Sequence, residues 1–92
     1  MPTVEMTRHL YRFFPTLENR TIIVPVGSVA DALRSIDTIA PGFSDYIIDE
    51  RGAARKHVNL SINDSILVDR KNLSDQLSEN ATLYIFQALS GG

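Results

Sequence analysis

The chain has 92 residues, of which 43% are hydrophobic and 22% are charged; its formal net charge is −2 and it contains no cysteine. This length favours one domain with a modest core and leaves little room for the cleft of a self-contained enzyme. The small negative charge argues against broad binding to nucleic acid or anionic membranes, because both need clustered positive charge. The lack of cysteine excludes a thiol nucleophile, a side-chain persulfide and a cysteine-ligated metal.

The beginning of the chain does not resemble a signal peptide, because Arg8, His9 and Arg12 interrupt its apolar run. No segment approaches the roughly 20 apolar residues that a membrane-spanning helix needs. A small domain without disulfides fits a reducing compartment. We therefore expect a cytoplasmic protein that binds neither membrane nor nucleic acid and is a monomer when free.

Two strands are predicted at the start of the chain. Residues 4–14 are rich in β-branched and aromatic side chains, which is typical of a strand. Residues 15–19 are predicted to form a turn, and residues 21–25 a second strand. Together they indicate a β-hairpin.

An amphipathic helix is predicted next. Its apolar side chains recur at steps of three and four residues, so that they share one helical face: Val29, Leu33, Ile36 and Ala40. Ser28 is a favourable N-cap, and Asp31 stands where an acidic side chain favours the helix dipole. Pro41-Gly42 is expected to end the helix.

The second half of the chain is predicted to be mainly strands. Residues 43–48 are expected to add a short helical turn and residues 49–57 a charged loop. Residues 58–62 alternate cleanly between apolar and polar side chains, a short strand follows at 65–68, and the last strand is predicted at 82–87. The order β-β-α-β-β-β predicts an α+β fold, in which one main helix packs on one face of a mixed sheet of four to five strands. This order is that of the β-grasp, or ubiquitin-like, fold.

We expect residues 1–87 to form this domain and residues 88–92 to form a flexible C-terminal tail that ends in Gly91-Gly92. A terminal Gly-Gly arises by chance in roughly 0.5% of chains, so a frayed end without a role is one interpretation. The other is chemical, because a terminal carboxylate is ionised at neutral pH and can attack the α-phosphate of ATP. Glycine lets backbone approach a catalytic centre closely, and five extended residues reach about 17 Å.

The predicted pattern, ending in IFQALSGG, resembles the ubiquitin-like sulfur carriers related to the small subunit of molybdopterin synthase and to the thiamine-pathway sulfur carrier. The resemblance spans nearly the whole chain; HVNLSIND at 57–64 also matches. It implies that an E1-like enzyme uses ATP and Mg to adenylate Gly92, which then becomes a thiocarboxylate. Gly91 and Ser90 would be the tail residues behind it. A sulfur-accepting synthase subunit would then receive the sulfur.

Details of the sequence favour one branch of this family. Many molybdopterin-synthase small subunits carry Pro-Pro where this chain has Gln87-Ala88, and the thiamine-pathway carriers are usually shorter. The length and the block at 55–59 are closer to carriers that deliver sulfur for cysteine synthesis. The resemblance implies a carrier without catalytic residues of its own. The pathway, the sulfur acceptor and the activating enzyme stay open.

Aromatic side chains near the tail are candidates for docking onto a partner. If Leu83 and Ile85 point into the core, Tyr84 and Phe86 fall on the opposite face of the last strand. Aromatic residues are enriched at interface cores, so we predict that Tyr84, Phe86 and the tail residue Leu89 contact a partner.

Other features have weaker functional interpretations. The basic cluster formed by Arg51, Arg55, Lys56 and His57 either meets an acidic partner or is a solvated loop. No second ligand stands at metal-binding spacing from either histidine, and no Gly-rich phosphate loop is present, so we expect no metal and no bound cofactor. A modifier joined through Gly92 to target lysines and a non-covalent interaction domain remain alternatives.

Overall fold

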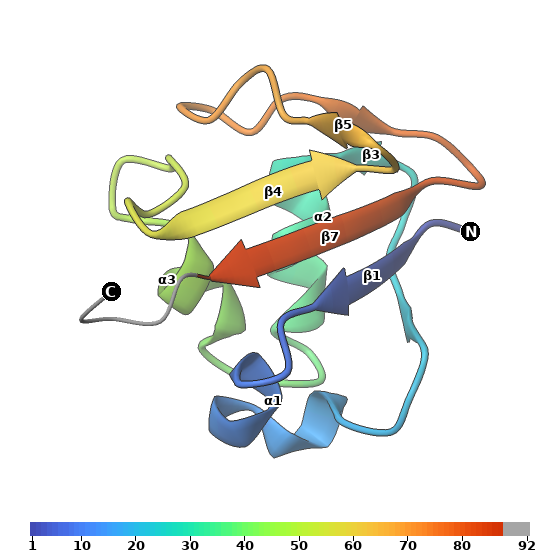
Figure 1. Ribbon diagram of the computed structural model, residues 1–92, viewed down its shortest axis with the longest axis vertical. Coiled ribbons are helices and arrows are strands. Elements are labelled where there is room, and N and C mark those ends of the chain that lie inside the picture. The colour runs from blue at the N-terminus through green and yellow to red at the C-terminus, as the bar shows by residue number, and fades with distance from the viewer. Residues whose placement is uncertain (88–92) are drawn as a thin grey trace.

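The computed structural model describes residues 1–87 (Figure 1). Its elements follow in the order β1 (Thr3–Met6), α1 (Leu10–Phe13), the 3₁₀ helix η1 (Pro15–Leu17), β2 (Ile22–Ile23), β3 (Gly27–Ser28), α2 (Val29–Ile36), α3 (Phe43–Ile47), β4 (Val58–Ile62), β5 (Ser65–Ile66), β6 (Gln76–Leu77) and β7 (Thr82–Gln87). None of the helices in this described part has the length and hydropathy needed to cross a membrane.

Within residues 1–87, five strands form a mixed sheet in the order β2-β1-β7-β4-β5, and β3 pairs with β6 separately. The first and last strands, β1 and β7, run parallel at the centre, while the other pairs are antiparallel. Helix α2 crosses behind this sheet (Figure 1). We call the sheet face away from α2 the open face. The predicted α+β fold, with one main helix on one face of a mixed sheet, is confirmed.

The predicted first strand is wrong over most of its length. Only Thr3–Met6 is a strand; the chain then turns, and Leu10–Phe13 is helical. The turn forms because the carbonyl of Thr7 accepts the N–H of Leu10 at 3.0 Å, which takes the backbone out of the sheet. Helical spacing brings Leu10 into the core, where it is fully buried, and packs Phe14 against the same core.

The antiparallel pairing of the predicted hairpin and the predicted helix are both present, but α1 and η1 replace the expected simple turn between the two strands. Strands β1 and β2 pair antiparallel, although β2 is only two residues long. Ser28 caps α2 as predicted, because its hydroxyl accepts the N–H of Asp31 at 3.1 Å. The four predicted apolar residues of the helix are all buried. Helix α2 ends at Ile36, yet a further turn keeps Ala40 in the core through a 2.9 Å bond from its N–H to the Ile36 carbonyl.

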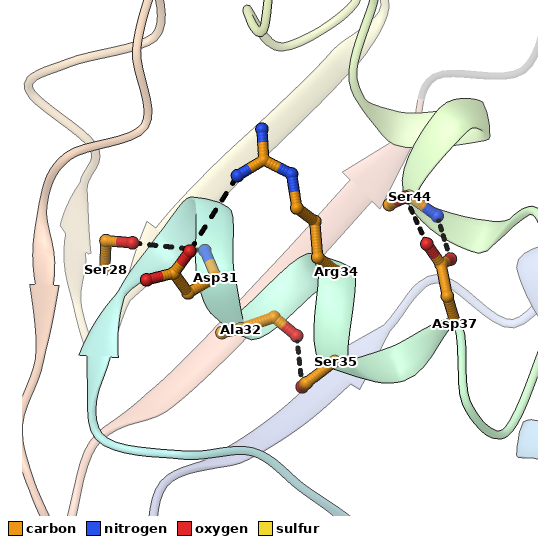
Figure 2. A network of polar contacts seen from close by, with 7 residues as sticks. All are labelled: Ser28, Asp31, Ala32, Arg34, Ser35, Asp37 and Ser44. Carbon is orange, nitrogen blue, oxygen red and sulfur yellow. Dashed lines mark hydrogen bonds and ion pairs between the residues drawn. The ribbon is translucent and has the colours of Figure 1, made fainter.

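Asp37 joins the end of α2 to the start of α3 (Figure 2). Its Oδ1 accepts the N–H of Ser44 at 2.7 Å, and its Oδ2 accepts the Ser44 hydroxyl at 2.5 Å. Helix α3 starts after Gly42, whose φ of 89° suits glycine. Glycine has no side chain that could accept a hydrogen bond from the first turn of α3, so the carboxylate of Asp37 takes this capping role.

Substitution of this cap is expected to weaken the fold. Asp37→Ala should lower the free energy of unfolding by about 1–2 kcal/mol, because a buried N–H and hydroxyl lose their acceptor. The control is Asp31→Ala, which removes an exposed 3.8 Å ion pair with Arg34 and should cost less than about 1 kcal/mol. Urea denaturation of both variants measures the difference. Equal losses would show that Asp37 does not cap α3.

The core lies between the sheet and the helices. Phe43 is its largest fully buried side chain, and its ring meets that of Phe14 edge to face at 5.1 Å. Strand β7 contributes Leu83 and Ile85, both with no exposed surface. Ile85 is the last buried core residue along the described chain. Among residues 1–87, the core residues therefore end before the chain reaches Gln87.

Candidate functional site

Strand β7 delivers the chain to the edge of the domain. It pairs with β1 on one side and with β4 on the other, and its last residue, Gln87, lies opposite Val58 at the start of β4. Leu89, Ser90, Gly91 and Gly92 lie outside the described residues. Their predicted roles, and the predicted tail at 88–92, therefore stay predictions.

The aromatic residues of β7 lie where the alternation predicted them. Tyr84 and Phe86 face away from the buried pair Leu83 and Ile85, and their rings stack with centroids 6.1 Å apart and planes inclined by 12°. Phe86 is 49% exposed, whereas Tyr84 is half-buried. The structure thus presents a stacked aromatic pair on the open face, within three residues of the last described one.

Strand β5 adds an apolar side chain that sequence analysis missed. Ile66 is 76% exposed and lies across β4 from Tyr84, because both residues pair with Ser61. A shallow groove on this face is lined by Ile66 and Phe86 together with polar residues of β4 and its turn, Asn59, Ser61, Asn63 and Asp64. We call Ile66, Tyr84 and Phe86 the open-face patch. Such exposed apolar residues near one another are typical of an interaction surface.

The basic cluster is partly used within the fold. The guanidinium of Arg55 donates to the carbonyl of Asp45 at 2.8 and 3.0 Å, and Arg70 donates to the carbonyl of Arg55 at 3.1 Å. The loop at 49–57 is also closed by Asp49, whose pKa is lowered by hydrogen bonds from the N–H groups of Ala53 and Arg51. For Arg55 the geometry supports a structural role. Arg51, Lys56 and His57 are exposed.

Asp69 organises the loop that follows β5. Its carboxylate accepts the Ser74 hydroxyl at 2.5 Å and backbone N–H groups of Asn72, Lys71 and Ser74. These hydrogen bonds lower the pKa of Asp69, and the bond from the Ser74 hydroxyl has the largest effect. Since they hold the ionised form, the loop is most stable when Asp69 is charged.

This lowered pKa predicts a pH-dependent contribution to stability. The contribution is complete above the unfolded-state pKa of about 3.9 and is lost as pH falls through the lower folded-state pKa. Asp69→Asn keeps one acceptor but removes the charge. The gap in unfolding free energy between wild type and Asp69→Asn should therefore be largest above about pH 4 and shrink below it. Urea denaturation from pH 7 to pH 2.5 measures this gap, and a gap that grows towards low pH would contradict the assignment.

The two histidines do not gather metal ligands. The Nε2 atom of His9 lies 3.2 Å from Oε1 of Gln87, and His57 is exposed beside the start of β4. Among the side chains of residues 1–87, no group of three or more His, Cys, Asp or Glu is placed to hold a metal ion.

Comparison with known proteins supports the fold. No protein-family model matches the sequence, and no curated protein matches it either. Three solved structures are similar. A chain in the crystal structure of the BexX/CysO complex of Amycolatopsis orientalis matches with a TM-score of 0.83 and 18% identity, over 100% of this chain and 100% of that one. CysO of Mycobacterium tuberculosis matches at 0.80 and 16%, over 97% of this chain and 100% of that one.

SAMP1 of Haloferax volcanii matches with a TM-score of 0.72 and 19% identity, over 99% of this chain and 98% of that one. All three similarities extend over almost the full length on both sides. At these identities they establish the architecture. The chain therefore has the β-grasp fold of CysO and SAMP1, as its resemblance to the ubiquitin-like sulfur carriers implied.

Proposed function

We propose that this chain is a sulfur carrier protein whose working group is the C-terminal carboxylate of Gly92. The observation that carries the proposal is the position of β7. This central strand of a β-grasp sheet ends at Gln87, and Gly91-Gly92 stands four and five residues beyond it in the sequence. A rigid domain would thus present a slim carboxylate terminus, which is the part a partner's active site needs to receive.

The proposed chemistry takes place in an activating enzyme. A carboxylate oxygen of Gly92 attacks the α-phosphorus of ATP, the bond from that phosphorus to the bridging oxygen breaks, and pyrophosphate leaves with Mg. A sulfide nucleophile then attacks the acyl carbon of the adenylate and expels AMP, which leaves a thiocarboxylate on Gly92. The carrier contributes no catalytic residue or bound cofactor in this scheme. ATP and Mg belong to the E1-like partner, and a synthase subunit accepts the sulfur.

The open-face patch is the proposed docking surface for the activating enzyme. It combines exposed aromatic and aliphatic side chains with a position beside the end of β7. Buried aromatic anchors carry much of the binding energy in protein interfaces. One of the similar structures, BexX/CysO, is itself a complex of two proteins.

Phe86→Ala is expected to weaken docking without unfolding the domain. Loss of an aromatic anchor that contributes about 2 kcal/mol to the binding free energy should raise the half-saturating carrier concentration for loading roughly thirtyfold. Phe13→Ala is the matched control, since Phe13 is 60% exposed but lies in α1, away from the patch. Loading is measured as thiocarboxylate formed against carrier concentration. An unchanged half-saturating concentration for Phe86→Ala would remove Phe86 from the docking surface.

The intact mass of the protein from its native cells, purified under denaturing and reducing conditions, tests the function. The proposal predicts a species in which one oxygen of the C-terminal peptide is replaced by sulfur. A ladder of higher-mass conjugates that survives reduction, with Gly92 joined to target lysines, would instead establish a protein modifier. A terminus that stays unmodified in cells and inert with MgATP would favour a non-covalent interaction domain.

A further inference from the structure

Thr7 lies where β1 leaves the sheet, next to the end of β7. Its N–H donates to the carbonyl of Ile85 at 2.9 Å, as expected for parallel strands. The next step of a regular ladder would join the N–H of Gln87 to the carbonyl of Thr7. That carbonyl instead accepts the N–H of Leu10, because the backbone turns there towards α1. The backbone alone thus leaves the last residue of β7 without its ladder partner.

The hydroxyl of Thr7 takes the place of the missing carbonyl. It accepts the N–H of Gln87 at 3.1 Å and donates to the carbonyl of Ile85 at 3.2 Å. The side chain of Gln87 is held as well, since its Oε1 lies 3.2 Å from Nε2 of His9, which donates when that nitrogen carries the proton. Two side chains from the connection between β1 and α1 therefore hold the last described residue.

We propose that Thr7 and His9 are positioning residues for the carboxylate of Gly92. They fix Gln87 as the point from which residues 88–92 start, and so set how far Gly92 reaches into the activating enzyme. This inference rests on the proposed sulfur-carrier function. If Gln87 leaves the sheet, the segment between the docked domain and the reacting carboxylate lengthens. The carboxylate then spends less time in attacking geometry, although the open-face patch still docks.

Amide hydrogen exchange on the isolated protein tests whether Thr7 holds Gln87. Thr7→Val removes the hydroxyl and keeps the β-branched shape, so exchange at the Gln87 amide should accelerate roughly tenfold or more. Thr7→Ser restores an acceptor and should restore protection. Thr3→Val is the control, because it removes a hydroxyl of β1 that lies 3.4 Å from the Thr82 hydroxyl at the other end of the ladder. It should leave Gln87 protected.

Loading kinetics test the positioning role. The assay is thiocarboxylate formation in native-cell extract supplied with MgATP and sulfide. Thr7→Val should lower the plateau rate roughly tenfold with the half-saturating concentration unchanged, whereas Phe86→Ala should raise that concentration. Thr7→Ser should recover the wild-type plateau. If Thr7 only stabilised the fold, Thr7→Val would not lower the plateau rate while leaving the half-saturating concentration unchanged.

Two results would overturn the inference. One is equal protection of the Gln87 amide in wild type and Thr7→Val, which would mean that the hydroxyl does not hold β7. The other is a wild-type plateau in Thr7→Val despite loss of that protection. If wild-type protein is not loaded at all, the carrier function and the positioning role fail together. Amide exchange would still decide whether Thr7 holds Gln87.

Discussion

Deletion of Gly92 is expected to abolish sulfur loading while the free energy of unfolding stays within about 0.5 kcal/mol of wild type. Ile85 is the last core residue among residues 1–87, so shortening the chain at residue 92 removes no described packing contact. The new carboxylate, on Gly91, falls one extended residue, about 3.4 Å, short of the reacting phosphorus. Attack needs the atoms within roughly 3–3.5 Å of each other, so this displacement is prohibitive.

Mass spectrometry after incubation with extract, MgATP and sulfide measures loading, and urea denaturation measures stability. Asn80→Ala, in the exposed turn before β7, serves as the control for handling, because it leaves the tail intact. A thiocarboxylate on Gly91 of the shortened protein would contradict the assignment of Gly92 as the working residue. Loss of loading together with unfolding would show instead that the terminus supports the fold.

Phe43→Ala is expected to lower the free energy of unfolding by about 3–5 kcal/mol. Phe43 is fully buried, and its ring packs edge to face on Phe14 at 5.1 Å with planes at 74°. The substitution removes the apolar contacts of a large ring and leaves a cavity between α3 and α1. Domains of this size are stable by about 5–15 kcal/mol, so the variant should lose a large part of its stability.

Phe13→Ala provides the matched comparison for this prediction. Phe13 also belongs to a ring pair, 5.5 Å from Tyr46, but 60% of its surface is exposed. Its removal should lower the free energy of unfolding by less than about 1 kcal/mol, because folding of the chain buries little of the apolar area of the Phe13 side chain. The midpoints and slopes of urea denaturation curves compare the two variants. Similar losses for both would show that Phe43 does not occupy the core as described.

The strand at 82–87 illustrates what sequence can predict. It lies in the centre of a sheet with one covered face, so burial alternates with period two and separates Leu83 and Ile85 from Tyr84 and Phe86. The helix after Ser28 was equally predictable, because the capping residue and the three- and four-residue spacing of the apolar side chains both indicate a helix that begins there. The fold class followed from these two elements and their order.

Two features could not be predicted from local pattern. The pattern of the run from Leu10 to Phe14 is compatible with either a strand or a helix. The helical conformation is favoured by the burial of Leu10 in the core among residues distant in sequence, which a local pattern does not reveal. The run Ile66-Leu67-Val68 is apolar throughout, so periodicity cannot tell which side chain faces water. Pairing with β4 places Leu67 inside and leaves Ile66 exposed. The open-face patch was therefore only partly foreseen.

The most direct test of the central claim is fragmentation of the C-terminal peptide after incubation with native-cell extract, sulfide and MgATP. The carrier account predicts that one oxygen of Gly92 is replaced by sulfur, that the exchange requires ATP, and that it is confined to that residue. If the Gly92 carboxylate stays unchanged in every extract fraction, with and without ATP, the account is contradicted and the domain is one that acts by binding alone.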